Sequence, residues 1–383
     1  MFEVSKLSNQ KPRAARRRAT VLAGIALAAA GLQAPAALAA APDPVQRSVN
    51  GLVRDDGVPA ALAAVTGRDG RSRDYTAGVG DLATGARVPR DGQVRIGSTT
   101  KAFTATVMLQ LVGEGKVGLD QPVDTYLPGL LRGDGIDGRR ITVRQLLQHT
   151  SGLPEYLTAI GNILADPHRY YEPRDLLDLA LTRKADFAPG TKWEYSNTNY
   201  IVAGLLIEKV TGRPLGEEIT TRIIDRLGLR HTYVPAPGEL TLRGPHPEGY
   251  QREASDGPWR DVTELDPSVA WAAGELVSTN SDINHFFTAL LSGKLLAPAE
   301  LAQMRTTVPA DKLGPGTRYG LGLMSQPLSC GGVFWGHGGD IPGYHTRGGV
   351  TDDGQAVSVT VTTIPDAATV QHVDTAVDTA LCR

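Results

Sequence analysis

The sequence has few of the features that mark several common protein classes. Only two cysteines occur in 383 residues, and aromatic residues make up 5% of the chain. The eight histidines show no His-Glu-x-x-His or paired spacing, so neither a metal nor another cofactor is indicated. No Gly-x-Ser-x-Gly segment marks an α/β-hydrolase. Gly78 and Gly80 lack the third glycine of a dinucleotide loop and are typical of a strand turn.

Long hydrophobic runs are also missing beyond the N-terminal segment. That segment has basic residues between positions 11 and 18, an alanine-rich apolar stretch from Val21 to Leu32, and then Ala37-Leu38-Ala39. This order predicts a signal peptide over residues 1–39, cleaved before Ala40, and hence a secreted, extracellular protein. Sec and twin-arginine export both stay open. The stretch is too short and interrupted for a stable membrane anchor, and no later segment is apolar enough to span a bilayer.

Negative charge exceeds positive charge in the part expected to remain after cleavage. The whole chain has a net charge of −2, and residues 1–39 hold six basic side chains and one acidic, which leaves about −7 for the rest. A net-acidic protein is a poor partner for nucleic acid or an anionic membrane surface. With 41% hydrophobic and 21% charged residues, the chain is typical of a globular protein, and we expect a monomer.

The two cysteines are Cys330 and Cys382. In an oxidising compartment an isolated pair favours a disulfide, which would fasten the last residues to a strand region. Two buried free thiols are the alternative.

The hydrophobic pattern predicts strands near both ends of the chain and helices between them. Helical spacing occurs at 43–53, 98–114, 201–210, 214–227, 281–291 and 366–381. Strand patterns occur at 60–65, 73–79, 319–323, 332–335 and 355–363. This order predicts an α+β fold, an α/β sandwich with an antiparallel sheet, built from residues 40–104 and 301–383. Residues 105–300 would form an inserted, mainly helical domain.

Ser98 and Lys101 begin a predicted helix. A serine hydroxyl needs a base before it becomes a nucleophile. Residues three apart share a helical face, so Lys101 lies beside Ser98, and burial would lower the pKa of its ammonium. A capping serine with an exposed lysine is the plainer alternative for this spacing.

Two further elements are weak alone and stronger in combination. Tyr195 and Asn197 stand two residues apart: a phenol near a lysine can relay a proton, and an amide can hold a substrate. The plainer alternative is a helix N-cap. His337 precedes Gly338 and Gly339 after a predicted strand, where small residues let a substrate lie against the strand edge.

Taken in order, these elements resemble the motifs S-x-x-K, Y-x-N and H/K-x-G of penicillin-binding proteins and class C β-lactamases. The chain is most similar to the secreted D-alanyl-D-alanine carboxypeptidase/transpeptidase group. Supporting segments include 95–101, 141–147, 149–153, 195–199, 202–209, 319–323 and 328–330. The resemblance implies the β-lactamase/transpeptidase-like fold and an acyl-enzyme on a small peptide, such as a peptidoglycan peptide, or on an amide or ester. β-Lactams would act as acylating ligands.

The resemblance also implies residue roles. Ser98 would be acylated, Lys101 would hold its proton, Tyr195 would relay a proton to the leaving group, and Asn197 would bind the acyl-side amide. His337 would act electrostatically and order the Tyr195 hydroxyl. The backbone N–H groups of Ser98 and Asp340 would form the oxyanion hole, and Trp271 would line the cavity.

The chain departs from that group where the substrate's terminal carboxylate binds. Gly338 and Asp340 replace two hydroxyl residues, and Met324 replaces an arginine. A carboxylate facing the cleft would repel a carboxylate substrate. We therefore expect a poor carboxypeptidase that prefers amides, aminopeptidase substrates or esters, unless Asp340 turns away. A class C-like β-lactamase and a non-catalytic penicillin-binding sensor are the remaining alternatives.

Overall fold

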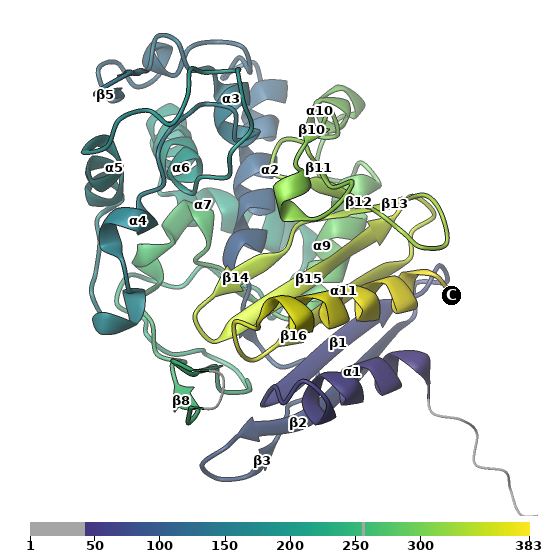
Figure 1. The fold of residues 1–383 in the computed structure, drawn as a ribbon. Coiled ribbons are helices and arrows are strands. Elements are labelled where there is room, and N and C mark those ends of the chain that lie inside the picture. Colours follow the sequence, from purple (N-terminus) through teal and green to yellow (C-terminus); the bar gives the residue numbers. More distant parts are fainter. Residues whose placement is uncertain (1–42, 255–256) are drawn as a thin grey trace, which may run out of the picture. The chain divides into compact units, whose positions relative to one another are not determined.

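A large antiparallel sheet lies at the centre of the molecule (Figure 1). The computed structural model describes residues 43–254 and 257–383, so the predicted signal peptide lies outside the described residues. Within them the sheet has the order β10-β11-β12-β13-β15-β16-β1-β2-β3, and β14 pairs with β15 beside this path. The bounds are β1 Ala60–Thr66, β2 Ser72–Asp81, β3 Ala86–Arg87, β10 Val308–Pro309, β11 Arg318–Tyr319, β12 Met324–Pro327, β13 Val333–Gly336, β14 Gly339–Ile341, β15 Tyr344–Thr351 and β16 Ala356–Val361. The predicted α+β class is confirmed.

Helices cover both faces of the sheet. α1 (Pro44–Arg54) and α11 (Ala367–Leu381) pack together on one face, in front of the sheet in Figure 1, and α9 (Asn280–Leu291) packs on the other. Side chains alternate between the faces along a strand, so every second residue of a central strand faces α1 and α11. On the two central strands these residues are apolar and buried: Ala61, Ala63, Val65, Val357, Val359 and Val361.

The remaining helices form a second layer around α2, whose residues are almost all buried. Their bounds are α2 Thr100–Gly113, α3 Val143–Leu147, α4 Leu157–Ile160, α5 Pro173–Leu181, α6 Thr198–Thr211, α7 Leu215–Ile219, α8 Asp225–Leu227 and α10 Pro298–Met304. Three two-stranded pieces accompany them: β4 Val94–Arg95 with β9 Val277–Ser278, β5 Arg132–Gly133 with β6 Ile136–Asp137, and β7 Tyr250–Gln251 with β8 Arg260–Asp261. The predicted boundaries at residues 104 and 300 stay predictions, since the described residues form one compact unit.

The predicted elements were located well, with two differences. The helix predicted over 214–227 is interrupted by a π-helical segment at Thr220–Ile224. The strand predicted over 319–323 ends at Tyr319, because Gly320 donates to the carbonyl of Leu323 and Gly322 has a φ of 71°, which makes a turn. In the part of the chain that the structure describes, no helix is long and apolar enough to cross a membrane.

Candidate active site

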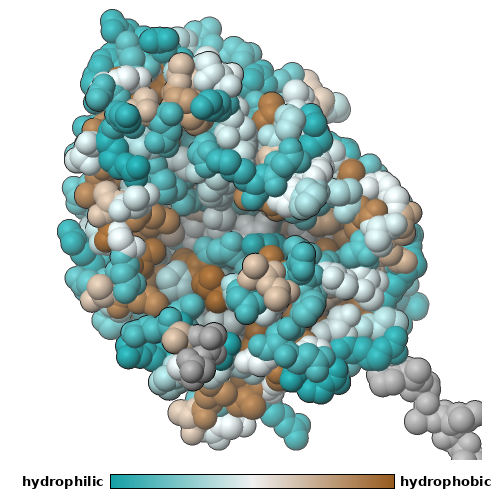
Figure 2. Space-filling model, in the orientation of Figure 1, coloured by the Kyte–Doolittle hydropathy of each residue, from teal (hydrophilic) through white to brown (hydrophobic). Residues whose placement is uncertain are grey.

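Ser98 lies in a short 3-10 turn, Gly97–Thr99, that leads directly into α2. Gly97 has a φ of 48°, a conformation that favours glycine. A Cβ atom on Gly97 would lie 2.9 Å from the backbone nitrogen of Asp340, so the two backbones touch. This contact brings the N–H groups of Ser98 and Asp340, the predicted oxyanion-hole donors, to the same place. Figure 2 shows a hollow across this face, just above β14 in the view.

Lys101 lies one helical turn beyond Ser98 and is fully buried. Its Nζ atom is 3.0 Å from Ser98 Oγ, 2.6 Å from Asn197 Oδ1 and 2.7 Å from the carbonyl oxygen of Ala273. Burial lowers the pKa of the Lys101 ammonium to about 7, against the opposing charges of Glu155 and Asp340. At neutral pH, Lys101 can therefore accept a proton from Ser98.

Tyr195 and Asn197 lie beside Ser98 and Lys101, which the family resemblance implied and the spacing alone did not show. The Tyr195 phenol lies close enough to the Ser98 side chain for Ser98 to lower its pKa against the effect of burial, and the Lys101 Nζ atom lies 5.0 Å from the centre of the Tyr195 ring. Burial raises the pKa of the Tyr195 phenol well above its usual value, so the phenol keeps its proton. Asn197 immediately precedes α6, and this placement orients its amide toward Lys101.

His337 is buried in a chain of hydrogen bonds that the sequence did not predict. His149 Nδ1 accepts from the N–H of Ser196 (3.2 Å), so its Nε2–H donates to the Tyr319 hydroxyl (3.1 Å). Tyr319 in turn donates to His337 Nε2 (2.8 Å), and His337 Nδ1–H donates to the carbonyl of Gly338 (2.6 Å). Burial lowers the pKa of His337 to about 3 and that of His149 well below its usual value, so both rings are neutral.

This chain corrects the role expected for His337. Both of its ring nitrogens are occupied, by Tyr319 and by Gly338, and its ring centre lies 6.4 Å from that of Tyr195. His337 therefore does not order the Tyr195 hydroxyl, and a neutral ring brings no positive charge. The segments containing His149 and Tyr319 were visible in the sequence, but nothing local showed that they meet.

β14 passes beside the Ser98 turn. A Cβ atom on Gly339 would lie 1.8 Å from the carbonyl oxygen of Ile96, so only glycine fits there. Because side chains alternate along a strand, Asp340 points to the opposite face. Its carboxylate accepts from His345 Nδ1 at 2.5 Å and from Arg347 at 3.1 Å. The Asp340 side chain is thus turned away from Ser98, and Arg347 balances its charge.

Gly338 faces the same way as Asp340 and leaves room for the Arg347 side chain. A Cβ atom on Gly338 would lie 2.8 Å from Arg347 Nη1. Met324 lies on β12, opposite Gly336 of β13, and is partly buried.

Glu155 is a site residue that sequence reasoning missed. Its Oε2 accepts from both the backbone N–H (2.7 Å) and the side-chain amide (2.9 Å) of Asn197, and its Oε1 accepts from the N–H of Leu157 (3.0 Å). Asn197 therefore links the Glu155 carboxylate to the Lys101 ammonium. Glu155 is only partly buried and forms no ion pair with any residue in the described ranges. Glu155 lies two residues beyond the recognised segment 149–153, but a carboxylate there carries no local signal of its own.

The remaining predicted residues are Trp271, Cys330 and Cys382. The indole of Trp271 packs against α6, where a Cβ atom on Gly204 would lie 2.7 Å from Trp271 Cζ3, and it borders a separate cavity. Cys330 and Cys382 form the predicted disulfide, which joins the β12–β13 turn to the end of α11.

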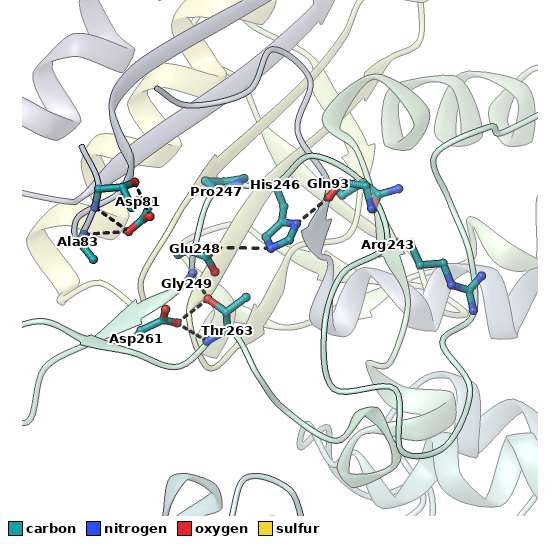
Figure 3. Close-up of polar contacts among 12 residues, drawn as sticks. Asp81, Ala83, Gln93, Arg243, His246, Pro247, Glu248, Gly249, Asp261 and Thr263 are labelled. Carbon is teal, nitrogen blue, oxygen red and sulfur yellow. Dashed lines mark hydrogen bonds and ion pairs between the residues drawn. The ribbon is translucent and has the colours of Figure 1, made fainter. Parts of the chain in front are cut away.

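Another cavity, of about 680 Å³, contains none of the predicted residues. It is lined by residues of the segments 162–168, 241–253 and 260–264, and Figure 3 shows part of its wall. His246 lies beside Glu248, and Asp261 accepts from the backbone and hydroxyl of Thr263. Charges of both signs line it without a nucleophile, so we place the active site at Ser98. Across the described residues, no group of three or more His, Cys, Asp or Glu could hold a metal ion.

A comparison of the whole chain with known protein families agrees with the geometry around Ser98. The profile of the Beta-lactamase family matches residues 45–381. The chain belongs to the β-lactamase family. It is therefore a serine hydrolase of the β-lactamase and penicillin-binding protein type, and the predicted family and fold are confirmed.

Several relatives of this family member are close in structure. The solved structure of a D-stereospecific amidohydrolase from a Streptomyces species is 40% identical, with a TM-score of 0.80 over 87% of this chain and 97% of that one. D-amino acid amidase from Ochrobactrum anthropi SV3, solved with L-phenylalanine amide, is 28% identical, with a TM-score of 0.78 over 88% and 97%. Penicillin-binding protein PbpX of Bacillus subtilis (strain 168) is 29% identical over 73% of this chain. The chain spans 55% to 64% of the length of the first curated relatives it matches.

Proposed function

We propose that this β-lactamase family member hydrolyses amides of D-amino acids that carry a free α-amino group, through an acyl-enzyme on Ser98. The observation that carries the proposal is Glu155, whose carboxylate is bonded to Asn197 and has no cationic partner among the described residues. An ammonium group on the acyl side of the substrate would supply that partner. The two solved structures of a D-stereospecific amidohydrolase and a D-amino acid amidase support the same substrate class.

The proposed reaction uses the contacts of the site in sequence. Neutral Lys101 takes the proton of Ser98 Oγ as Oγ attacks the amide carbonyl, and the N–H groups of Ser98 and Asp340 stabilise the oxyanion. Tyr195 donates its proton to the leaving amine as the C–N bond breaks, and regains one from the Lys101 ammonium, which becomes neutral again. Water then attacks the ester in the same way and releases the D-amino acid and free Ser98.

Carboxypeptidase activity, which the family resemblance implied, is the weaker proposal. The expected repulsion from Asp340 does not decide it, because Arg347 pairs with that carboxylate and the side chain points away from Ser98. Instead, Glu155 makes the acyl side of the site acidic. A peptide whose amine is already acylated has no ammonium group to pair with the Glu155 carboxylate. On the leaving-group side, Gly338 and Met324 offer no side chain that would bind a terminal carboxylate.

The test compares kcat/KM for D-phenylalanine amide, its L enantiomer, N-acetyl-D-phenylalanine amide and D-Ala-D-Ala peptides. We expect D-phenylalanine amide to be hydrolysed fastest, and Ser98→Ala to be inactive. Glu155→Gln should lower kcat/KM for the free amine by about tenfold or more, with little change for the N-acetyl compound. Glu194→Gln, at an exposed ion pair with Lys312, is the matched control.

Other outcomes point to the alternatives. Faster hydrolysis of the D-Ala-D-Ala acid, with Glu155→Gln neutral, would establish a carboxypeptidase. Hydrolysis of none of these substrates, with a lasting penicillin adduct on Ser98, would favour a penicillin-binding sensor. Export is also a proposal, resting on residues 1–39, and a mature protein that begins at residue 40 by intact mass would support it.

A further inference from the structure

A second cavity lies beyond Trp271, outside the catalytic residues. Its volume is about 640 Å³, within the range of small-molecule sites. The segments that line it are the start of α5, the middle of α6, residues 214–221, residues 234–237 and the turn from Trp271 to Glu275. None of the residues that contact Ser98 through a side chain borders it, so it is a different site from the one described above.

Glu275 is the unusual residue of this cavity. The residue is 5% exposed, yet its carboxyl accepts no hydrogen bond and forms no ion pair with any residue of the described ranges. A buried polar group without a partner is costly, and native proteins usually satisfy such groups with water or a ligand. Burial, together with the charges of Glu208 and Asp266, raises the pKa of Glu275 to about 8. A cation bound in the cavity would pair with the Glu275 carboxylate and offset the cost of burying its charge.

The other charged residues that line the cavity are mostly acidic. Glu208, Glu172 and Glu217 also border the cavity, whereas its one basic lining residue is Arg174, which pairs with Asp178. Glu208 is half-buried, and only its Oε1 atom has a protein donor, the N–H of Leu215 (2.9 Å). The other walls are apolar and aromatic, from prolines, Leu205, Val234 and the indole of Trp271. Aromatic faces attract cations electrostatically.

We propose that this cavity binds a small organic cation, an ammonium or guanidinium group on an apolar body. Glu275 and Glu208 provide the counter-charges, and Trp271 provides the ring over which the cation lies. This site does not depend on the proposed function, because Glu155 and Ser98 take no part in it.

The same turn connects the cavity to the catalytic centre. Trp271 has a φ of 35°, in the left-handed region that a tryptophan rarely adopts. Between Trp271 and Glu275, Ala273 offers its carbonyl oxygen to Lys101 Nζ at 2.7 Å. A cation that orders Trp271 and Glu275 therefore also fixes the position of a Lys101 hydrogen bond, and its occupancy should alter the pKa of Lys101.

The proposal is tested by isothermal titration calorimetry at pH 8 with 2-phenylethylammonium, and with 2-phenylethanol as its neutral counterpart. Because the proposed function also lets this ammonium bind at Glu155, the test is made in the Glu155→Gln variant, where we expect one site whose binding is weakened by about tenfold or more when Glu275→Gln is added. Glu217→Gln, at the rim and already paired with Arg213, is the matched control and should leave binding normal when added to the same variant. Binding that persists without the Glu155 carboxylate separates this site from the catalytic one. The neutral alcohol should bind much more weakly.

Two results would overturn the proposal. They are absence of binding to the Glu155→Gln variant at millimolar probe, and equal binding by that variant with and without Glu275→Gln. If Glu275→Gln does not fold, as judged by circular dichroism, Glu208→Gln is measured in its place, and unchanged binding by that variant counts against the proposal.

Discussion

The hydroxyl of Tyr319 lies 2.8 Å from Nε2 of His337 and donates its proton to that nitrogen. With His149 behind Tyr319 and the Gly338 carbonyl beyond His337, four groups form one directed chain of hydrogen bonds. The direction is fixed at its start, where His149 Nδ1 accepts from a backbone N–H. The chain ends on the backbone of Gly338, and so it holds the start of β14 beside Ser98.

This arrangement predicts that neither histidine titrates between pH 5 and 8. The pKa of His337 is about 3 and that of His149 is lowered well below its usual value, in both cases mainly by burial, so each stays neutral as pH falls through 6.5. Long-range ¹H–¹⁵N spectra should show the Nδ1–H form of His337 and the Nε2–H form of His149 throughout. A ¹⁵N shift of either ring with a midpoint near pH 6.5 would contradict the chain.

Removing the phenol oxygen of Tyr319 should be costly. Tyr319→Phe leaves two buried nitrogens unpaired, and we expect a loss of about 2 kcal/mol or more in the free energy of unfolding. Tyr344→Phe, which removes one buried hydrogen bond to the carbonyl of Pro247, is the matched control and should cost less. Urea denaturation of both variants measures the difference, and equal losses would show that the chain adds nothing to stability.

Activity should depend on the protonation of Lys101. Because burial lowers the pKa of Lys101 to about 7, the neutral amine that accepts the Ser98 proton predominates above pH 7 and is lost below it. We expect kcat/KM to fall about tenfold per pH unit below pH 7 and to level off above pH 8. p-Nitrophenyl acetate is the suitable substrate, since it has no titrating group in this range. A flat profile from pH 5 to 8 would exclude Lys101 as the base.

Sequence reasoning succeeded where the chemistry is local. Ser98 and Lys101 share a helical turn, so spacing alone placed these two groups near one another, whereas the place of Asn197 beside them came from the family resemblance. The order of helix and strand patterns predicted a sheet that is built from both ends of the chain. The disulfide followed from the cysteine count.

The missed residues depend on contacts that no short pattern records. Glu155 meets Asn197 across 42 positions, and His149 meets Tyr319 across 170. The orientation of Asp340 required the pairing of β14 with β15, a hairpin whose strands were not predicted. The turn at Trp271 has a φ of 35°, a backbone conformation that residue types do not reveal either.

Gly339 should be irreplaceable. In Gly339→Ala the new Cβ atom would lie 1.8 Å from the Ile96 carbonyl oxygen and 3.1 Å from the Ser98 nitrogen, so the backbone must shift at the nucleophile. We expect kcat/KM to fall by about a hundredfold or more, since small displacements of reacting groups have large effects on rate. Gly338→Ala is the matched control, because its Cβ atom meets mainly the flexible end of Arg347. Equal activities of the two variants in a p-nitrophenyl acetate assay would refute the argument.

The Cys330–Cys382 disulfide should contribute to stability and not to catalysis. It closes a loop with a sequence separation of 52 between the β12–β13 turn and the end of α11, away from Ser98. Constraining a loop of that length in the unfolded chain is worth about 4 kcal/mol in the loop-entropy description. We expect the double variant Cys330→Ala/Cys382→Ala to lose stability of that order in urea denaturation, with kcat/KM at 25 °C unchanged. Ser329→Ala, which removes the neighbouring hydrogen bond to Asp378 and keeps the disulfide, is the control. If the double variant unfolds at the wild-type urea concentration, the packing of α11 on the sheet already holds the end of the chain, and the cross-link adds no constraint of its own.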